Sequence, residues 1–335
     1  VPNGDRLRAA MDGLDFVVAL DVYINETTSR ADVILPYTVQ VEHSNYDFMF
    51  QSTSVRNFAR YSPQALAPEP GARDQWQLLL EICGRMNGMT VAQLDQLVFD
   101  GLAERIGAGL PEVGAGRIKA LAGEEPGPER LLDLMLRAGP YGDRFGGGEG
   151  LTLARVKAAA HGIDLGPLTP GRLPGILRTE GKRIRLLHPL LEEDLLRLHA
   201  RLRAGPPPGL LLIGRRHIRD MNSWLHNLPH FVRGRNRCTL RMHPDDALAR
   251  GLAEGAEAIV SSAAAERRLS VEISDELMPG VVSLPHGFGH RYADTGQPHA
   301  SAHAGVSAND LVGDGLDMPS GTSIVNGVPV EVRAL

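Results

Sequence analysis

Polar residues and glycine are concentrated in one stretch of the sequence, beginning at the end of a predicted strand at Gly209–Arg216. Glycine lets the backbone approach a ligand closely, and arginine offers a planar fork of donors that suits a pyrophosphate. Asparagine and serine side chains can form hydrogen bonds with polar ring edges. A polar loop between two strands is the alternative, but the density of donors favours a ligand site. The residues assigned to it are Gly214, Arg215, Arg216, His217, Asn222 and Ser223.

Arginines gather in two groups, one inside this stretch and one just after it. A solvated surface is the ordinary explanation for such groups, and a pocket that binds phosphate through guanidinium groups is the alternative. The formal net charge of the whole chain is -5, which argues against a nucleic-acid-binding surface, because such surfaces need clustered excess positive charge. The groups are Arg215, Arg216 and Arg219, and Arg233, Arg235 and Arg237.

Histidines are dense near the end of the sequence, in two pairs with a spacing of four residues. On a helix this spacing would present both imidazole rings to one metal ion. The surrounding segments are rich in glycine and small residues, however, and do not predict stable helices. We therefore expect loop histidines that form hydrogen bonds with a ligand or with the backbone, rather than metal ligands. The pairs are His286 with His290 and His299 with His303.

Asp21 lies near the end of the apolar run Phe16–Tyr23, which is typical of a strand buried on both faces of a parallel sheet. In open α/β sheets, ligands bind at the carboxyl ends of strands. A carboxylate there can accept hydrogen bonds from a guanine edge or from ribose hydroxyls. A turn or helix-cap carboxylate is the alternative, and the residues alone leave both open.

Motifs for several other activities do not occur in the sequence. There is no GxSxG nucleophile segment, no phosphate-binding loop and no GxGxxG after a strand. The two cysteines, Cys83 and Cys238, cannot form a four-cysteine cluster, and we expect both in the core and in a reducing compartment. No apolar run approaches the roughly 20 residues of a membrane helix, so no membrane span is expected.

Strands and helices alternate in the first 205 residues, which predicts an α/β architecture. Residues 107–181 are rich in glycine and proline and indicate a variable region around short helices. Pro206–Pro208 is a stiff run at which we place the domain boundary. The expected strands are Phe16–Tyr23, Ala31–Pro36 and Arg183–Leu187, and the expected helices are Arg73–Asn87, Val91–Ile106, Glu129–Arg137, Leu153–His161 and Leu191–Leu202.

The remaining residues contain short apolar runs separated by turn residues, which predict a β-barrel. A short helix is expected to begin at His243. The expected strands are Gly209–Arg216, Thr239–Met242, Ala256–Ser262, Arg268–Ser274, Val281–Leu284 and Val328–Arg333.

The first part of the chain resembles the third domain of the dimethyl sulfoxide reductase superfamily, which are molybdenum or tungsten enzymes that carry bis(molybdopterin guanine dinucleotide). Its members have a strand ending in Asp, a Thr-rich turn, an ADxxLP segment, a Glu-containing loop and a helix that opens with Asp-x-Trp. Asp74 and Trp76 occupy that last position here. The matching segments are LDVYINETTSRADVILP (Leu20–Pro36), VEHSNY (Val41–Tyr46) and RDQWQLLLEICGRM (Arg73–Met86).

The last part of the chain resembles the superfamily's molybdopterin dinucleotide-binding domain, a six-stranded double-psi β-barrel. The resemblance implies that residues 1–205 are the C-terminal part of a Rossmann-like αβα domain and that residues 206–335 are the barrel domain. The matching segments are HPDDALARGLAEGAEAIVSS (His243–Ser262), SDELMPGVVSLPHGFGH (Ser274–His290), Asn309–Leu311 and Asp317–Gly321.

The resemblance also implies which residues meet the cofactors. Leu20 and Asp21 would meet the guanine–ribose end of one dinucleotide, with His43 and Asp74 nearby. The second cofactor's pterin or pyrophosphate would be surrounded by Gly214, Arg215, Arg216, His217, Asn222 and Ser223, with hydrogen bonds on the pterin side from His286, Asn309 and Asn326.

Three of these positions depart from the family pattern. His43 and Asn326 stand where some members have Lys, so the resemblance does not support a phosphate contact there. His286 stands where other members have an aromatic residue.

The family's metal ligand lies in its second domain, and many members have a Cys-rich iron–sulfur motif at the N-terminus. Neither region occurs here, and the chain begins with Val1 rather than Met. The resemblance thus implies the cofactor-binding C-terminal portion of a formate dehydrogenase-like or nitrate reductase-like oxidoreductase, with no catalytic or metal-ligating residue of its own and inactive in isolation. An iron–sulfur cluster would lie only in the missing N-terminal segment. Its expected partners are that N-terminal half and an electron-transfer subunit or ferredoxin-like donor, in the cytoplasm.

Two alternatives remain open. A non-catalytic scaffold subunit could reuse the same fold without a complete redox site. An independent hydrolase would require a metal ion bound by the late histidines.

Overall fold

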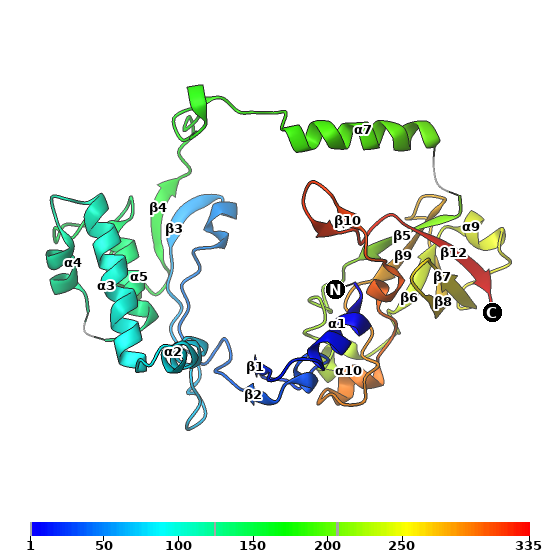
Figure 1. The fold of residues 1–335 in the computed structure, drawn as a ribbon, viewed down its shortest axis with the longest axis horizontal. Coiled ribbons are helices and arrows are strands. Elements are labelled where there is room, and N and C mark those ends of the chain that lie inside the picture. The colour runs from blue at the N-terminus through cyan, green and yellow to red at the C-terminus, as the bar shows by residue number, and fades with distance from the viewer. Residues whose placement is uncertain (1, 124, 206–207) are drawn as a thin grey trace. The chain divides into compact units, whose positions relative to one another are not determined.

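The computed structural model describes residues 2–123, 125–205 and 208–335. Its contacts divide the chain into two compact units (Figure 1). The barrel unit comprises Val1–Ala19, Tyr23–Val33 and Ile184–Leu335, and the helical unit comprises Leu20–Val22 and Ile34–Arg183. The division into domains at residues 205 and 206 stays a prediction, and Pro206 and Pro207 lie outside the described residues.

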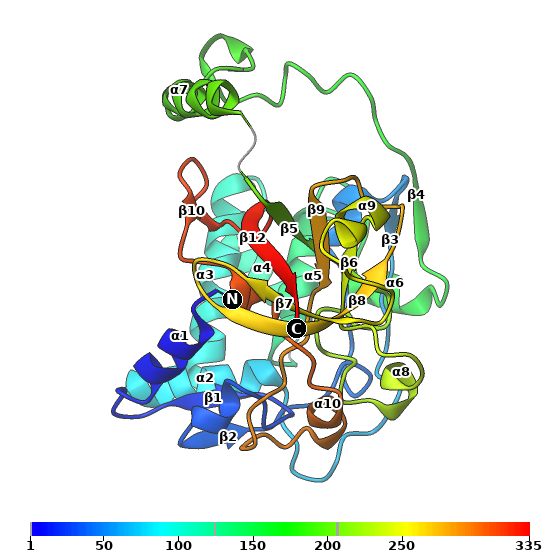
Figure 2. The ribbon, with the colours of Figure 1, turned by 90° about the vertical axis from the view of Figure 1, so that its right-hand side faces the viewer.

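Six strands form a closed barrel in the order β12-β5-β9-β6-β8-β7 (Figure 2). The β5–β9 and β6–β8 pairs are parallel, whereas β12 is antiparallel to both β5 and β7. The architecture, α/β followed by a six-stranded β-barrel, confirms the sequence prediction. The strands are β5 (Leu210–Arg215), β6 (Thr239–Met242), β7 (Glu257–Ser261), β8 (Glu266–Ile273), β9 (Val281–Pro285) and β12 (Val328–Ala334).

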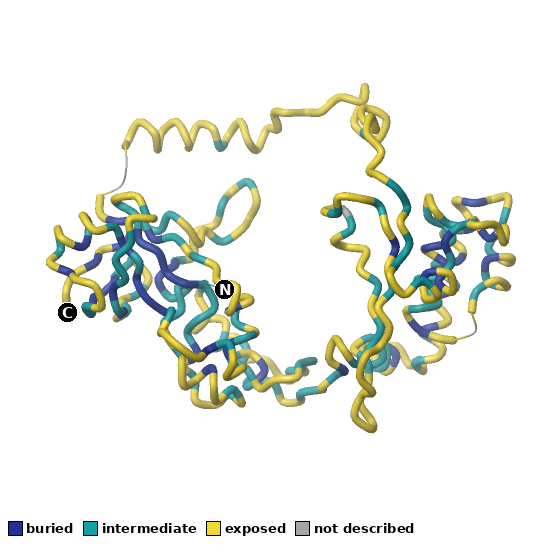
Figure 3. The backbone as a smooth tube through the Cα atoms, turned by 180° about the vertical axis from the view of Figure 1, so that it is seen from behind, coloured by how far each residue is buried: buried dark blue, intermediate teal, exposed yellow. Residues whose placement is uncertain are grey.

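Alternating apolar residues of these strands fill the barrel, because successive side chains of a strand point to opposite faces. Leu240, Met242 and Leu284 are fully buried. Figure 3 shows the buried backbone concentrated in the barrel strands. The same core includes Leu210, Leu212, Ala258, Val260, Leu269, Val271, Val282, Val330 and Val332.

Shorter elements surround the barrel within its unit. Residues 23–33 and α1 pack on the loop that follows β9: the Gly296 N–H donates to the Ile24 carbonyl (2.7 Å), and Arg291 pairs with Asp5 (2.7 Å). These elements are α1 (Gly4–Met11), η1 (Thr28–Arg30), α7 (Pro189–Ala204), α8 (Pro229–Val232), α9 (Pro244–Leu248), α10 (Pro298–Ala302), η4 (Ala308–Leu311), β10 (Leu316–Asp317) and β11 (Thr322–Ser323).

The helical unit contains two small cores. Phe99, Ile118 and Leu134 pack with Phe145 in the first, and Ala59 and the residues around it form the second. The unit's elements are η2 (Phe50–Thr53), β3 (Arg56–Ala59), α2 (Gln75–Met86), α3 (Val91–Gly109), α4 (Ala115–Leu121), α5 (Pro128–Ala138), α6 (Leu153–Ala158), β4 (Ile163–Pro167) and η3 (Glu180–Lys182). β1 (Val18–Leu20) and β2 (Val33–Leu35) form a separate two-stranded sheet.

Several expectations for individual segments were wrong. The run Arg183–Leu187 alternates like a strand but pairs with no other segment in the described part of the chain, and Leu186 is 88% exposed. Phe16 and Val18 are also exposed, because a two-stranded sheet cannot cover both of its faces. Cys83 is exposed on α2, whereas Cys238 is buried as predicted. No helix among the described residues is long and apolar enough to span a membrane.

Candidate functional site

A cavity of about 350 Å³ opens beside the barrel and is called here the Arg216 cavity. Strand register places its charged residues together. β5 and β9 run parallel, with Arg215 opposite Pro285, so the residues that follow each strand emerge at the same edge. The His286 N–H donates to the Arg215 carbonyl (2.9 Å) and extends this pairing. The cavity is lined by Arg216, His217, Asp220, Met221, Asn222 and His286.

Unusual backbone conformations shape the wall of this cavity. Met221 and Asn222 have φ values of 42° and 63°, in the left-handed region that side-chain-bearing residues rarely adopt. Gly287 has a φ of 97°, and a Cβ atom there would lie 1.5 Å from the Asn222 carbonyl oxygen. Only glycine therefore lets the two loops meet. Backbone strain of this kind is concentrated at functional sites in proteins.

Side-chain contacts hold several of the predicted residues in place. The Gly214 N–H donates to Asn326 Oδ1 (2.8 Å), and the Arg216 guanidinium donates to Asn222 Oδ1. The Ser223 backbone lies close to Gly287, but Ser223 does not line the cavity. Asn309 lies in η4 and does not line the Arg216 cavity.

Arg215 differs from its neighbour Arg216 because its guanidinium lies across the neighbouring barrel strands and bonds to them. It donates to the Ser283 carbonyl (2.6 Å) and to the carbonyl and hydroxyl of Thr239 (2.9 and 2.8 Å), and it lies 3.6 Å from Glu272 Oε2. Burial lowers the pKa of Arg215, and the Glu272 carboxylate opposes this effect. These contacts join β5, β9 and β6, so they give Arg215 a structural role in the barrel.

Asp220 is the most buried residue of the Arg216 cavity, with 2% of its surface exposed. Its Oδ1 accepts from Arg237 Nη2 (2.6 Å), while its buried Oδ2 has no hydrogen-bond partner among the residues that the structure describes. Burial, followed by the nearby Arg216 guanidinium, lowers the pKa of His286 and favours its neutral imidazole. The cavity therefore offers a cation and a neutral imidazole, with the Asp220 carboxylate buried in its wall. Asp220 was not predicted, since a single Asp in a polar loop carries no motif.

A second cavity, of about 880 Å³, lies in the helical unit and is called here the His43 cavity. Asp74 is the N-cap residue of α2. Its carboxylate accepts from the Thr38 hydroxyl (2.5 Å) and from Trp76 Nε1 (3.2 Å). His43 Nδ1 lies 3.0 Å from the Ser44 carbonyl oxygen, which fixes the ring. Both predicted residues, His43 and Asp74, line this cavity.

Glu129 is a charged centre of the His43 cavity that the sequence did not reveal. Its carboxylate accepts hydrogen bonds from Ser44 (3.1 Å), Tyr61 and Lys157. Although burial opposes ionisation, the hydrogen bonds from Lys157, Tyr61 and Ser44 hold the pKa of Glu129 below its ordinary value. These four residues come from segments far apart in the sequence, so no local pattern could have predicted the cluster.

Leu20 and Asp21 lie at the end of β1 and line neither cavity. The Val22 N–H donates to Asp21 Oδ1 (2.7 Å), and the predicted ligand contact of Asp21 stays a prediction.

The late histidines do not form a metal site among the described residues, where no group of three or more His, Cys, Asp or Glu side chains could hold an ion. His303 Nδ1 contacts the His299 carbonyl (3.0 Å), as expected for a backbone-bonded histidine. His290 is buried and contacts His226, whose role the sequence did not indicate.

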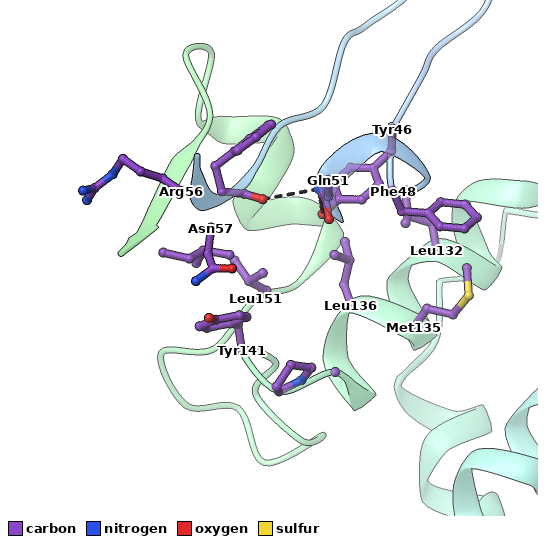
Figure 4. A pocket seen from close by; sticks show the side chains of 14 residues that line it. Tyr46, Phe48, Gln51, Arg56, Asn57, Leu132, Met135, Leu136, Tyr141 and Leu151 are labelled. Carbon is purple, nitrogen blue, oxygen red and sulfur yellow. Dashed lines mark hydrogen bonds between the residues drawn. The ribbon is translucent and has the colours of Figure 1, made fainter. Parts of the chain in front are cut away.

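Figure 4 shows a third cavity, of about 310 Å³, between the two-stranded sheet of β3 and β4 and α5 of the helical unit. Its walls are mostly apolar, with Leu132, Leu136 and Leu151 among them. Gln51 donates to the Phe58 carbonyl (3.3 Å), and Asn57 donates to the Pro167 carbonyl (2.8 Å). This cavity thus presents a largely neutral surface without a charge cluster.

Comparison with known families matches two parts of the chain. The family described as molydopterin dinucleotide binding domain matches residues 210–329, and the family described as molybdopterin oxidoreductase matches residues 1–85. These ranges contain the Arg216 cavity and the first part of the His43 cavity.

Two individual proteins are also similar to this chain in sequence. The alpha subunit of an NADPH-Fe(3+) oxidoreductase from Geobacter sulfurreducens is 23% identical over 290 residues, which are 86% of this chain and 26% of that protein. Formate dehydrogenase H from Escherichia coli is 35% identical over 80 residues, which are 24% of this chain and 10% of that protein. The chain thus spans about a quarter of the length of the Geobacter subunit.

Among solved structures, acetylene hydratase from Pelobacter acetylenicus has a similar fold. The match has a TM-score of 0.66 at 16% sequence identity, and it covers 100% of this chain and 42% of that chain. At this identity the likeness concerns the fold alone.

Proposed function

Because the chain belongs to the molybdopterin oxidoreductases of the dimethyl sulfoxide reductase superfamily, we propose that it holds parts of two molybdopterin guanine dinucleotides for a molybdenum or tungsten oxidoreductase. Its dinucleotide-binding domain makes a molybdopterin dinucleotide its cofactor. The metal ligand and any iron–sulfur cluster would come from residues outside this sequence, as would the catalytic residues.

One observation carries the proposal for the barrel unit. Asp220 lines this cavity, and its buried Oδ2 has no hydrogen-bond partner in the described part of the chain. An unpaired buried carboxylate oxygen costs free energy, which a ligand N–H or O–H would recover. The pterin ring presents such donors, and Arg216 can pair with a phosphate. The residues present therefore fit a pterin or pyrophosphate, held by Arg216, His217, Asn222 and His286, with Gly214 and Asn326 beside them.

The His43 cavity would hold the guanine–ribose end of the other dinucleotide. Asp74 lines it with a carboxylate, and His43, Ser44 and Gln77 add further polar groups. Its volume lies within the range of ordinary cofactor sites. Leu20 and Asp21 remain proposed contacts of the same dinucleotide, as does Asn309 for the second.

When bound, the cofactor supplies the metal and the redox chemistry. The residues of this chain would bind the dinucleotides, orient them and exclude water. The remainder of the same enzyme is the first proposed partner, and an electron-transfer subunit or ferredoxin-like donor is the second. The Geobacter relative is itself named as the alpha subunit of its enzyme, which supports a multi-subunit assembly. A cytoplasmic location is also part of the proposal.

The test is mass spectrometry of the denatured chain for molybdopterin guanine dinucleotide, combined with metal analysis, after expression in a host that makes the cofactor. The double variant Arg216→Ala/His217→Ala is expected to lose at least about tenfold of the bound dinucleotide, since two or more charge-assisted contacts disappear. Arg235→Ala, which removes an exposed arginine of the same unit, is the matched control. Equal cofactor content in both variants would remove the Arg216 cavity from the site, and absence of both cofactor and metal would favour a non-catalytic scaffold.

A further inference from the structure

Helix α7 of the barrel unit is exposed along nearly all of its length, and none of its 16 residues is buried (Figure 3). Its leucines are 42–73% exposed. A helix of this length is only marginally stable alone in water, because most helical stability in proteins comes from packing of an apolar face. An exposed apolar face on such a helix therefore indicates a surface that another molecule covers.

Four of these leucines follow each other at steps of four, three and four residues, which is the spacing of the seam positions of a coiled coil. Each residue turns the helix by about 100°, so the four side chains share a stripe roughly 60° wide. Leu190 and Leu196 lie more than about 100° from the centre of this stripe. The stripe is called here the Leu191 seam, and its members are Leu191, Leu195, Leu198 and Leu202.

A contact between α7 and β10 lies on another side of the helix. Arg197 Nη2 is 3.9 Å from Asp317 Oδ1. Position 197 is about 130° around the helix from the centre of the Leu191 seam. The seam therefore faces away from this contact and is open to a second molecule.

The charges of α7 are divided between its two halves. Three acidic residues lie in the first half and three basic residues in the second, so their charges cancel. A membrane surface attracts helices with a basic polar face, which α7 does not have. Two copies of α7 side by side in parallel would place like charges together, whereas an antiparallel pair would place opposite charges together. The six residues are Glu192, Glu193, Asp194, Arg197, Arg201 and Arg203.

We propose that the Leu191 seam is a dimerisation surface, which pairs antiparallel with the same helix of a second copy of this chain. A two-fold axis midway between Leu195 and Leu198 places each of these leucines against the other one in the second copy. The same axis places Leu191 against Leu202 of the second copy. All four seam leucines thus meet a leucine in a single register.

The residues beside the seam agree with this register. Asp194 and Arg201 each precede a seam leucine by one position, so Asp194 faces Arg201 of the second copy on one flank. Glu192 and His199 each follow a seam leucine, so Glu192 faces His199 of the second copy on the other flank. Asp194 Oδ1 also pairs with Arg197 of its own helix (2.6 Å), and a carboxylate can accept from a second arginine through its other oxygen.

This surface lies outside the two cavities proposed to hold the dinucleotides, and the proposal does not depend on them. One short helix from each copy forms a small interface, so the dimer should be weak, with a Kd of about 10 μM.

The experiment measures the mass of the 335-residue chain by analytical ultracentrifugation between about 1 and 200 μM, where we expect a shift from monomer to dimer. Leu195→Glu should raise the dimer Kd at least about 30-fold, because it places a carboxylate against Leu198 of the second copy. Leu196→Glu is the matched control outside the seam and should change the Kd less than about threefold. A monomer at every concentration would overturn the proposal, as would equal effects of the two variants.

Asp194→Arg and Arg201→Asp test the antiparallel register at low ionic strength. Each variant alone should raise the dimer Kd about tenfold, because both flanking ion pairs become contacts between like charges. An equimolar mixture of the two variants should dimerise like the unaltered chain, because each copy then offers the charge opposite to that of the other. Failure of the mixture to dimerise would contradict the proposal, and it is the result expected if the remainder of the enzyme or another protein covers α7.

Discussion

The Arg216 cavity and the His43 cavity present similar polar groups but hold them in different ways. In the barrel unit, strand register and left-handed backbone fix the groups that follow β5 and β9. In the helical unit, a helix N-cap and the Glu129 cluster hold them through side chains. Substitutions that alter the backbone around the Arg216 cavity should therefore cause the largest loss in the free energy of unfolding. Single side-chain substitutions and pH changes at the His43 cavity should cause smaller losses.

The largest expected effect comes from Gly287→Ala in the barrel unit. The new Cβ would lie 1.5 Å from the Asn222 carbonyl oxygen, so a loop must move, and we expect a loss of about 4 kcal/mol in the free energy of unfolding. Gly251→Ala is the control, because Gly251 also has a positive φ but open space around it, and it should cost about 1–2 kcal/mol. Urea unfolding measures both. Equal losses would show that the loop contact is not what restricts position 287.

Arg215→Ala should destabilise the barrel by about 3 kcal/mol, because it removes hydrogen bonds to the Ser283 and Thr239 carbonyl groups and one of the cations beside Glu272. Arg216→Ala, one residue further on and exposed, should change stability by less than about 0.5 kcal/mol. Thermal and urea unfolding measure the stability of both variants and so distinguish an arginine that stabilises the barrel from one that faces a ligand. A stable Arg215→Ala protein that has lost its cofactor would reverse the assignment.

In the helical unit, Asp74→Ala removes the N-cap of α2 together with hydrogen bonds from Thr38 and Trp76. We expect it to cost about 1–2 kcal/mol. Glu149→Ala, at an exposed position of the same unit, is the control and should have almost no effect. Circular dichroism during urea unfolding gives both values. If Asp74→Ala lowered the free energy of unfolding as much as Gly287→Ala does, the predicted difference between the two units would be wrong.

The smallest effect concerns pH. The folded-state pKa of Glu129 lies below its unfolded value, so its ionised form stabilises the protein above an unfolded pKa of about 4.3, and this contribution disappears as the pH falls through the folded pKa. The effect should stay below about 1 kcal/mol, because the side chain is 38% exposed and solvent screens it. Glu129→Gln should flatten the acid side of the stability profile. If Glu129→Gln left the pH dependence of stability unchanged, the Glu129 cluster would not be the source of the loss of stability in acid.

The sequence predicted the barrel well because its strands are short apolar runs bounded by turn residues. Thr239–Met242 was predicted with its bounds as observed. The helices α2, α3, α5, α6 and α7 were also expected, within a few residues at their ends. β4 (Ile163–Pro167) was missed, since it contains glycine and proline, and Arg183–Leu187 shows that alternation without a pairing partner does not make a strand.

The sequence predicted those site residues that directly follow the ends of neighbouring parallel strands, because such residues emerge at the same edge of the sheet. Arg216, His217, Asn222 and His286 come together because two parallel strands end at one edge. The different partners of Arg215 and Arg216 were not evident from the sequence motif, because Arg216 lies beyond the end of β5. Glu129, Asp220 and His226 could not be predicted, because their partners come from distant segments.

The position of β12 in the closed barrel has a consequence for synthesis of the chain. Val328–Ala334 pairs with both β5 and β7, so the strands made before it retain two open edges until this segment has emerged from the ribosome. Open edges invite pairing with other chains. The barrel can therefore close only after translation of this segment is complete, and a nascent chain stalled before residue 328 would need a chaperone to keep those edges apart.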